Sequence, residues 1–291
     1  MVQILDGAAV ARPIREGLRE ALQTLENAGV TPGLATVLVG DDPADERYIS
    51  LKHRTCSEFG IESFDHRLAA NAPVERAIET VRSLNTDSDV HGIFVQVPLP
   101  AHVESRLRNA VDPPKDVDCF TPTNVGSLVV DEPRFEPPTP LAILRLLEAV
   151  PVDLDGADVV VVGRSSFVGK PLLNLLLRRG DATVTSCHSH THDLGQKTRR
   201  GDVVVVGANE PKLVDGSMIR DGAVVIDAGL NRVETDDGYE AVGDVDFESV
   251  RPRADVVTPV PGGVGPMTLT MLLSNTIRAA SRQEGVPVAL P

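Results

Sequence analysis

The 291-residue chain has few cysteines. Cys56, Cys119 and Cys187 are widely spaced and odd in number, which disfavours a disulfide scaffold and favours a reducing cytoplasm. The sequence also lacks an apolar run long enough to span a bilayer, and its first residues lack the basic region of a signal peptide. We therefore expect a cytoplasmic protein that has no membrane partner.

The chain also has no excess of basic over acidic residues. Lys and Arg total 28 against 42 Asp and Glu, giving a formal net charge of −14, which argues against a nucleic-acid partner. The acidic residues are spread along the chain, which predicts a dispersed acidic surface. The length suffices for two domains.

The usual G-x-G-x-x-G fingerprint of dinucleotide-binding proteins is absent, yet residues 157–171 have the matching order of elements. The valine run Val159–Val162 predicts a buried strand, Gly163-Arg164-Ser165 a turn, and the residues from about Gly169 to Arg179 a helix. Such a turn and helix start present backbone N–H groups to a phosphate. The alternative is a βαβ unit that binds no phosphate, in which Gly163 only makes a tight turn.

The second strand of this unit, predicted at Ala182–Thr185, does not end in Asp or Glu. In NAD sites a carboxylate at that point binds the ribose 2′-OH. Here Arg164 and Ser189 are available instead as donors to a 2′-phosphate. The sequence therefore predicts NADP as the cofactor.

Strands and helices alternate along the chain, which predicts an α/β fold with mainly parallel sheets. A proline-rich crossing from Pro113 to Pro140 marks the expected domain boundary. We expect the last helix to pack back on the first domain. The predicted domains are 1–138 plus 268–291, an α/β catalytic domain, and 139–267, a Rossmann-like NADP-binding domain. Further helices are expected near 10–25, 43–59, 74–84, 141–149 and 268–280, and strands at 35–39, 92–97, 203–206, 223–227 and 255–257.

Four polar residues are candidates for catalysis. Tyr48 and Lys52 are four residues apart on a predicted helix and share one face; burial would lower the lysine pKa, although an exposed lysine beside a packed tyrosine is the simpler alternative. Gln96 ends a buried strand, where α/β proteins place ligands, and its amide needs a partner there. Asp118 could accept two N–H groups of a flat heterocycle, although either Asp116 or Asp118 could instead cap a turn.

Two further segments are unusual. Glycines and prolines alternate through 258–268, which predicts a rigid loop with exposed backbone donors that could contact cofactor and substrate; a purely structural loop is the alternative. His188, His190 and His192 alternate and could bind a metal. They follow the strand end where the 2′-phosphate is expected, so we predict no metal site.

Together these segments resemble the bifunctional methylenetetrahydrofolate dehydrogenase/methenyltetrahydrofolate cyclohydrolase family. The matching motifs occur in the family's order over nearly the whole chain. They are Val39–Pro43 with Tyr48 and Lys52, Val95–Pro100, Lys115–Asp118, Gly163–Ser165 with Val168–Pro171, Cys187–Ser189, Val225–Arg232, Val242–Val245 and Pro261–Thr268.

The resemblance implies two domains around a cleft, a homodimer, and one site for two reactions of one-carbon metabolism that serve purine biosynthesis. A hydride passes from 5,10-methylenetetrahydrofolate to NADP⁺, and water then opens the methenyl cation to 10-formyltetrahydrofolate. Carried over by position, Lys52 assists hydrolysis, Tyr48 stacks on the folate, Gln96 tunes the lysine and Asp118 anchors the pterin. Pro261, Gly262 and Gly263 would join these residues in binding substrate. The implied cofactor-binding residues are Gly163, Arg164, Ser165, Ser189, Thr139 and Asn231.

Three positions depart from the family pattern: Cys119 and Asn209 stand where glycine is usual, and Pro138 where cysteine is usual. None of them removes a catalytic group. The alternatives left open are a dehydrogenase without cyclohydrolase activity, an enzyme for another pterin carrier, a shikimate-type dehydrogenase, and a non-catalytic NADP-binding sensor.

Overall fold

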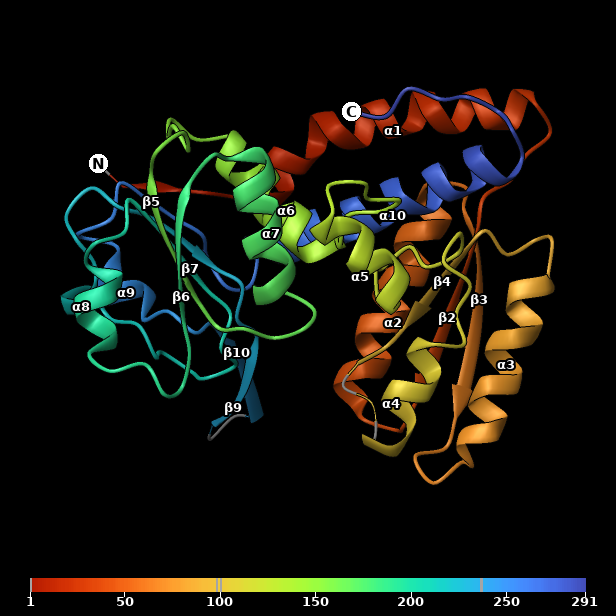
Figure 1. Cartoon of the computed structure of the whole chain (residues 1–291), viewed down its shortest axis with the longest axis horizontal. Helices are drawn as coiled ribbons and strands as arrows, with labels where there is room; N and C mark the ends of the chain where they lie inside the picture. Colours follow the sequence, from red (N-terminus) through yellow and green to blue (C-terminus); the bar gives the residue numbers. More distant parts are fainter. Residues whose placement is uncertain (1, 98, 100, 236–237) are drawn as a thin grey trace. The chain divides into compact units, whose positions relative to one another are not determined.

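The computed structural model describes residues 2–97, 99, 101–235 and 238–291, which form two compact units (Figure 1). The six-stranded unit combines the N-terminal residues up to Arg12 with Thr139–Thr268. The three-stranded unit combines Pro13–Pro138 with Leu269–Pro291. The predicted α/β class with parallel sheets is confirmed in both units.

The six-stranded unit is built on a parallel sheet of order β1-β11-β8-β7-β5-β6. Val159 to Val162 and Val203 to Val206 are all buried, as expected for parallel strands covered on both faces. The strands are β1 (Gln3–Ile4), β5 (Asp158–Val162), β6 (Thr183–Cys187), β7 (Val203–Val206), β8 (Val224–Asp227) and β11 (Val256–Val257), with an antiparallel hairpin of β9 (Asn231–Thr235) and β10 (Gly238–Val242). The helices are α6 (Pro138–Glu148), α7 (Gly169–Arg179), α8 (Leu194–Thr198), η1 (Gly216–Met218) and α9 (Phe247–Val250).

The three-stranded unit has the parallel sheet β3 (Glu62–Leu68), β2 (Gly33–Val39), β4 (Gly92–Val95), in that order. Its core joins Leu18 of α1, Leu34 of β2 and Ile277 of α10 in one apolar cluster. The last helix therefore packs into this unit, as predicted. The helices are α2 (Pro43–Glu58), α3 (Val74–Thr86), α4 (Ala101–Arg108) and α5 (Pro122–Val129), together with α1 (Gly7–Asn27) from Pro13 onward and α10 (Val264–Gln283) from Leu269 onward.

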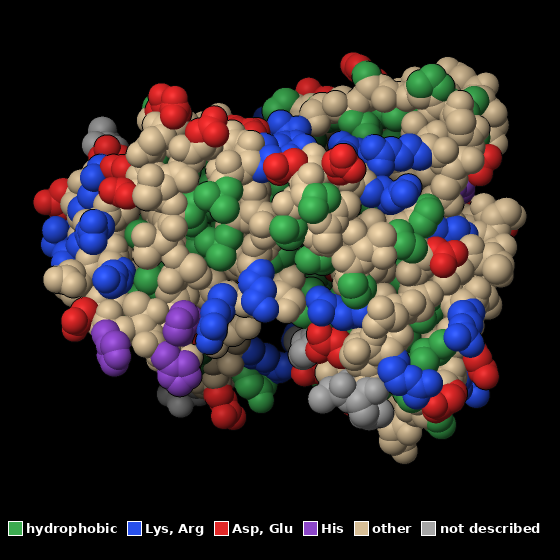
Figure 2. Space-filling view, in the orientation of Figure 1, with side chains coloured by type: hydrophobic (Ala, Val, Ile, Leu, Met, Phe, Trp, Pro, Cys, Tyr) green, Lys and Arg blue, Asp and Glu red, His purple; other side chains and the backbone are tan. Residues whose placement is uncertain are grey.

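The structure differs from the expected organisation at two points. The first twelve residues group with the six-stranded unit instead of the first predicted domain, because β1 pairs with β11 through Gln3 and Val256. The strand expected at 92–97 ends at Val95, so Gln96 directly follows it. Within the described part of the chain, no helix is long and apolar enough to cross a membrane. Figure 2 shows Asp and Glu scattered among Lys and Arg on the face it draws.

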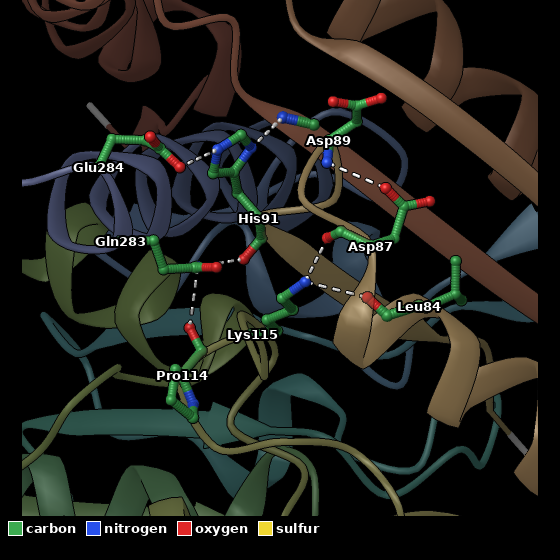
Figure 3. Close-up of polar contacts among 9 residues, drawn as sticks. Leu84, Asp87, Asp89, His91, Pro114, Lys115, Gln283 and Glu284 are labelled. Atoms are coloured by element: carbon green, nitrogen blue, oxygen red, sulfur yellow. Dashed lines mark hydrogen bonds and ion pairs between the residues drawn. The ribbon is translucent and has the colours of Figure 1, made fainter.

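A buried polar cluster ties α10 and α3 to the sheet of the three-stranded unit (Figure 3). The Lys115 ammonium donates to the carbonyls of Leu84 (3.0 Å) and Asp87 (2.6 Å), so it lies at the carboxyl end of α3, where a cation is favoured. Gly33 N–H donates to Nδ1 of the His91 ring, and the His91 carbonyl accepts from Gln283 at 2.8 Å. The Lys115 side chain therefore has a structural role.

Replacing Lys115 by Met should lower the free energy of unfolding by about 1.5–3 kcal/mol, the range for hydrogen bonds to a charged group. Urea unfolding followed by circular dichroism measures this loss. The matched control is Arg82→Met on the exposed face of α3, which should change stability by less than about 0.5 kcal/mol. Equal effects of the two substitutions would contradict the role of Lys115.

Candidate active site

The lysine of the sequence motif is buried between two aromatic rings. Tyr48 and Lys52 lie on the same face of α2 because their spacing is close to one helical turn. The Lys52 side chain is 2% exposed. Its Nζ lies 3.3 Å from the centroid of the Tyr48 ring and 4.2 Å from that of Phe94. The alternative of an exposed lysine is therefore wrong.

Gln96 contacts this lysine from the end of β4. Lys52 Nζ donates to Gln96 Oε1 at 3.2 Å. The Gln96 amide nitrogen donates to Asp45 Oδ1 at 2.8 Å and to the Val97 carbonyl at 2.9 Å. Both amide hydrogens are thus engaged, and the oxygen faces the lysine.

Burial sets the protonation of this cluster. Loss of solvation lowers the pKa of Lys52 to about 7, opposed by the carboxylates of Asp118 and Asp45. Burial also raises the pKa of Tyr48 to about 12, so its phenol keeps its proton. A lysine with a pKa near neutrality can give or take a proton at physiological pH.

The two aspartates of the Lys115–Asp118 motif have different environments. Asp116 accepts hydrogen bonds from the N–H groups of Phe120 and Thr121 and from the side chains of Thr121 and Asn124, so it organises the following turn. No described residue donates a hydrogen bond to the Asp118 carboxylate, and burial raises its pKa, with Asp116 adding to the shift. The turn-capping alternative thus applies to Asp116, and Asp118 retains its acceptors for a ligand.

Two of the departures from the family pattern have a backbone explanation. Cys119 has φ of 56° and Asn209 has φ of 56°, the left-handed region that glycine enters without strain. Asparagine tolerates this conformation, and Cys119 adopts it at a cost of about 1–2 kcal/mol. The turn conformation is retained in both places although the glycine is not.

The turn after β5 has the tight geometry expected of a phosphate loop. Gly163 has φ of 115°, and a Cβ there would collide with the Gly207 carbonyl, so only glycine fits. The Ser165 hydroxyl oxygen accepts the N–H groups of Val168 (3.1 Å) and Gly169 (3.4 Å) at the start of α7. Ser165 therefore shapes the helix start, and its hydroxyl hydrogen remains available for a ligand.

The carboxyl ends of β5 and β6 lie side by side, because Val162 pairs with Cys187. Arg164 and Ser189 follow these ends and are exposed. The pKa of His188 is lowered by loss of solvation and then by the charge of Arg164, which places these two side chains near each other. An exposed guanidinium and a hydroxyl beside a glycine turn fit a phosphate monoester. Among the described residues, no three His, Cys, Asp or Glu side chains are grouped to hold a metal.

Asn231 and Asp244 brace this same unit. Asn231 Nδ2 donates to Asp244 Oδ1 at 2.7 Å and to the Val242 carbonyl. Asp244 also accepts the backbone N–H groups of residues 208–210. A Cβ on Gly229 would collide with this Asp244 carboxyl group, and one on Gly243 would collide with Asp227. The Asn231 amide nitrogen thus donates its hydrogen bonds within the protein, and the amide oxygen is left for a ligand.

The remaining predicted residues are held by neighbours in the six-stranded unit. The Gly262 carbonyl accepts from Gly7 N–H at 2.9 Å, and Gly263 N–H donates to the Pro259 carbonyl at 2.9 Å. The loop containing Pro261 is therefore pinned at both sides. The Thr139 hydroxyl lies 3.4 Å from that of Thr268.

Sequence reasoning missed two residues of the lysine cluster. Asp45 precedes Tyr48 by three residues and Lys52 by seven, so helical spacing places it on the same face of α2. Phe94 precedes Gln96 by two residues, which places both on one side of an extended segment. The spacing of Asp45 and that of Phe94 could both be seen in the sequence, but residue spacing does not show which side-chain contacts form.

Comparison with known proteins shows similarity over the whole chain. Residues 5–118 match the catalytic domain of the tetrahydrofolate dehydrogenase/cyclohydrolase family, and residues 137–284 match its NAD(P)-binding domain. A protein of Halobacterium salinarum called bifunctional protein FolD is 55% identical over the full length of both chains. Its counterpart in Natronomonas pharaonis is 54% identical, again over both full lengths.

The chain is also similar to solved structures. The methylenetetrahydrofolate dehydrogenase-cyclohydrolase of Trypanosoma brucei, complexed with NADP and an inhibitor, is 40% identical, with a TM-score of 0.93 and coverage of 97% of this chain and 98% of that one. These matches define a two-domain α/β enzyme with a nicotinamide dinucleotide domain. The chain belongs to the tetrahydrofolate dehydrogenase/cyclohydrolase family, which confirms the predicted resemblance, the enzyme class and the cofactor type.

Lys52→Met should make stability less dependent on pH. The pKa is 10.5 for the free side chain and about 7 in the fold, so folding disfavours the charged form. The lysine therefore lowers stability below about pH 10, and the full penalty is reached below about pH 7. After the lost Gln96 contact is subtracted, the variant should be about 1–3 kcal/mol more stable at pH 7. This advantage should shrink as pH rises toward 10.

Urea unfolding at pH 6, 7, 8 and 9.5 measures the effect. The control Lys170→Met, at an exposed position of α7, should follow the wild type at every pH. A constant difference between Lys52→Met and wild type across this range would show that the buried lysine does not titrate as described.

Proposed function

We propose that this chain oxidises 5,10-methylenetetrahydrofolate with NADP⁺ and hydrolyses the 5,10-methenyl product to 10-formyltetrahydrofolate, with Lys52 serving the second step. The observation that carries this proposal is the buried Lys52, held between two rings and bonded to Gln96. A cationic methenyl substrate repels an ammonium group, and burial favours the neutral amine. The amine can then assist the attack of water by taking up its proton.

The substrate roles follow from which groups are unsatisfied. Asp118 offers carboxylate acceptors that no described residue uses, which suits the N–H groups of a pterin. Tyr48 keeps its phenol neutral and presents a ring for stacking. Gln96 fixes the amine of Lys52. The backbone of Pro261, Gly262 and Gly263 is proposed to complete substrate binding.

The cofactor is proposed to bind in the six-stranded unit. The turn Gly163–Ser165 and the start of α7 would hold its phosphates, Arg164 and Ser189 would hold its 2′-phosphate, and Thr139 and Asn231 would complete the cofactor site. When bound, NADP⁺ supplies the acceptor for a hydride, a step that needs alignment but no strong base.

We also propose a cytoplasmic homodimer. Leu230 and Tyr239, both exposed beside or on the β9–β10 hairpin, suit an interface. A monomer in sedimentation experiments would contradict the dimer.

The proposal is tested with purified protein, 5,10-methylenetetrahydrofolate and NADP⁺. We expect NADPH to form while little methenyl product accumulates, because hydrolysis follows oxidation. With Lys52→Met, methenyl product should accumulate after acid quenching and hydrolysis should fall at least 100-fold, while NADP⁺ binding is unchanged. NADPH formation without hydrolysis in the wild type would reduce the function to dehydrogenase alone. No turnover would leave another pterin carrier or a sensor.

Arg164→Ala should weaken the binding of NADP⁺ far more than that of NAD⁺, because the guanidinium is proposed to contact the 2′-phosphate that NAD⁺ lacks. A charge-assisted hydrogen bond to phosphate corresponds to about a 10- to 100-fold change in Kd. Titration of both nucleotides against wild type and variant measures this ratio. Arg178→Ala, on the last turn of α7, is the control. Equal losses for both nucleotides would place the 2′-phosphate elsewhere.

A further inference from the structure

The Asp45 carboxylate holds the Gln96 amide in a single orientation. Gln96 Nε2 donates to Asp45 Oδ1 at 2.8 Å and to the Val97 carbonyl at 2.9 Å. A flipped amide would bring its oxygen against two acceptors and leave its nitrogen facing the Lys52 amine. Gln96 is only 6% exposed, so water does not readily replace these partners. The observed orientation is the one that satisfies every group.

The fold holds Asp45 firmly at this place. It occupies the first turn of α2, where a negative charge is favoured by the helix dipole. Tyr48 and Lys52 follow on the same face of that helix, so one element positions both ends of the Asp45–Gln96–Lys52 chain. The other ionisable groups that act on Lys52 are Asp118, on the segment between α4 and α5, and Cys56 on α2; Asp42 acts on Asp45.

We propose that Asp45 is a positioning residue for the hydrolytic step: it orients Gln96 so that the amide oxygen holds the Lys52 amine, and its negative charge favours the ammonium form of that lysine. This inference rests on the proposed function of Lys52. Hydride transfer requires no proton from Lys52, so Asp45 should affect hydrolysis and spare oxidation.

The charge has a defined sign. The Asp45 carboxylate favours the ammonium form and raises the pKa of Lys52 against the opposing effect of burial. Removing the carboxylate should therefore move the rising limb of the hydrolysis profile to lower pH. Removing the acceptor should lower the plateau of that profile. The two effects are separable, because asparagine lacks the charge but keeps an acceptor oxygen.

The test compares Asp45→Ala, Asp45→Asn and Glu46→Ala in the full-length protein. Glu46 is the next residue of the same turn, and its carboxylate pairs with Arg67 at 3.5 Å instead of with Gln96. Cyclohydrolase kcat and dehydrogenase kcat are measured from pH 5.5 to 9. Asp45→Ala should lower the hydrolysis plateau about tenfold, as expected for one oriented hydrogen bond, and change oxidation less than twofold. Asp45→Asn should restore the plateau to within about twofold and keep the shift to lower pH.

A second measurement does not depend on activity. A small amine-reactive reagent labels Lys52 in its neutral form, so the labelling rate measured as a function of pH reports the pKa of the amine. The labelled lysine is identified by peptide mass spectrometry. The midpoint should move to lower pH in both Asp45 variants and stay in place in Glu46→Ala. Unchanged labelling, equal losses of both activities, or Asp45→Asn as impaired as Asp45→Ala would overturn the role of Asp45. A wild type that does not hydrolyse, but whose labelling shifts as expected, would refute the proposed function instead.

Discussion

The exclusion of water from one lysine is the constraint that governs the candidate site of the three-stranded unit. A buried ammonium that lacks a carboxylate contact is costly, and the fold reduces the cost by letting the amine lose its proton. Tyr48 and Phe94 cover it, and Gln96 gives it a neutral acceptor. Lys115 in the same unit shows the opposite solution, since two backbone carbonyls accept from its ammonium. The same type of side chain is thus proposed to serve chemistry in one place and has a structural role in the other.

Carboxylates that accept backbone N–H groups perform a second task, which is to shape the loops around the sites. Asp116 holds the turn at residues 120–121, and Asp244 holds the one at residues 208–210. Loops lack the repetitive hydrogen bonding of helices and strands, so a buried carboxylate with several acceptor positions can replace it. Asp227 has the same role, since its buried carboxylate accepts the backbone N–H groups of Gly229, Asp244 and Val245.

The sequence was most informative where physical patterns are strong. Valine runs identified β5 and β7, and the glycine turn after β5 indicated that helix α7 follows. Strand β3 was not found, because Glu62–Leu68 alternates poorly and includes three charged residues. The pairing of β1 with β11 was also not predictable, since it joins segments that are far apart in sequence. Lys52, Tyr48 and Gln96 were found as candidates, but the contact between the Gln96 amide and Asp45 was not, because no sequence pattern specifies a side-chain contact.

Two glycines of the six-stranded unit are packed closely against two aspartates. Gly229 lies against the carboxyl group of Asp244, and Gly243 lies against that of Asp227. Each glycine leaves the volume that the opposite carboxyl group occupies. A side chain at position 229 would fit only if residue 244 were shorter than aspartate. In the same way, a side chain at position 243 would fit only if residue 227 were shorter than aspartate. Change at these four positions is therefore expected to occur in pairs over evolutionary time. Replacing only the glycine of a pair would remove the space for the carboxyl group. Replacing only the aspartate would remove the carboxyl group that fills this space.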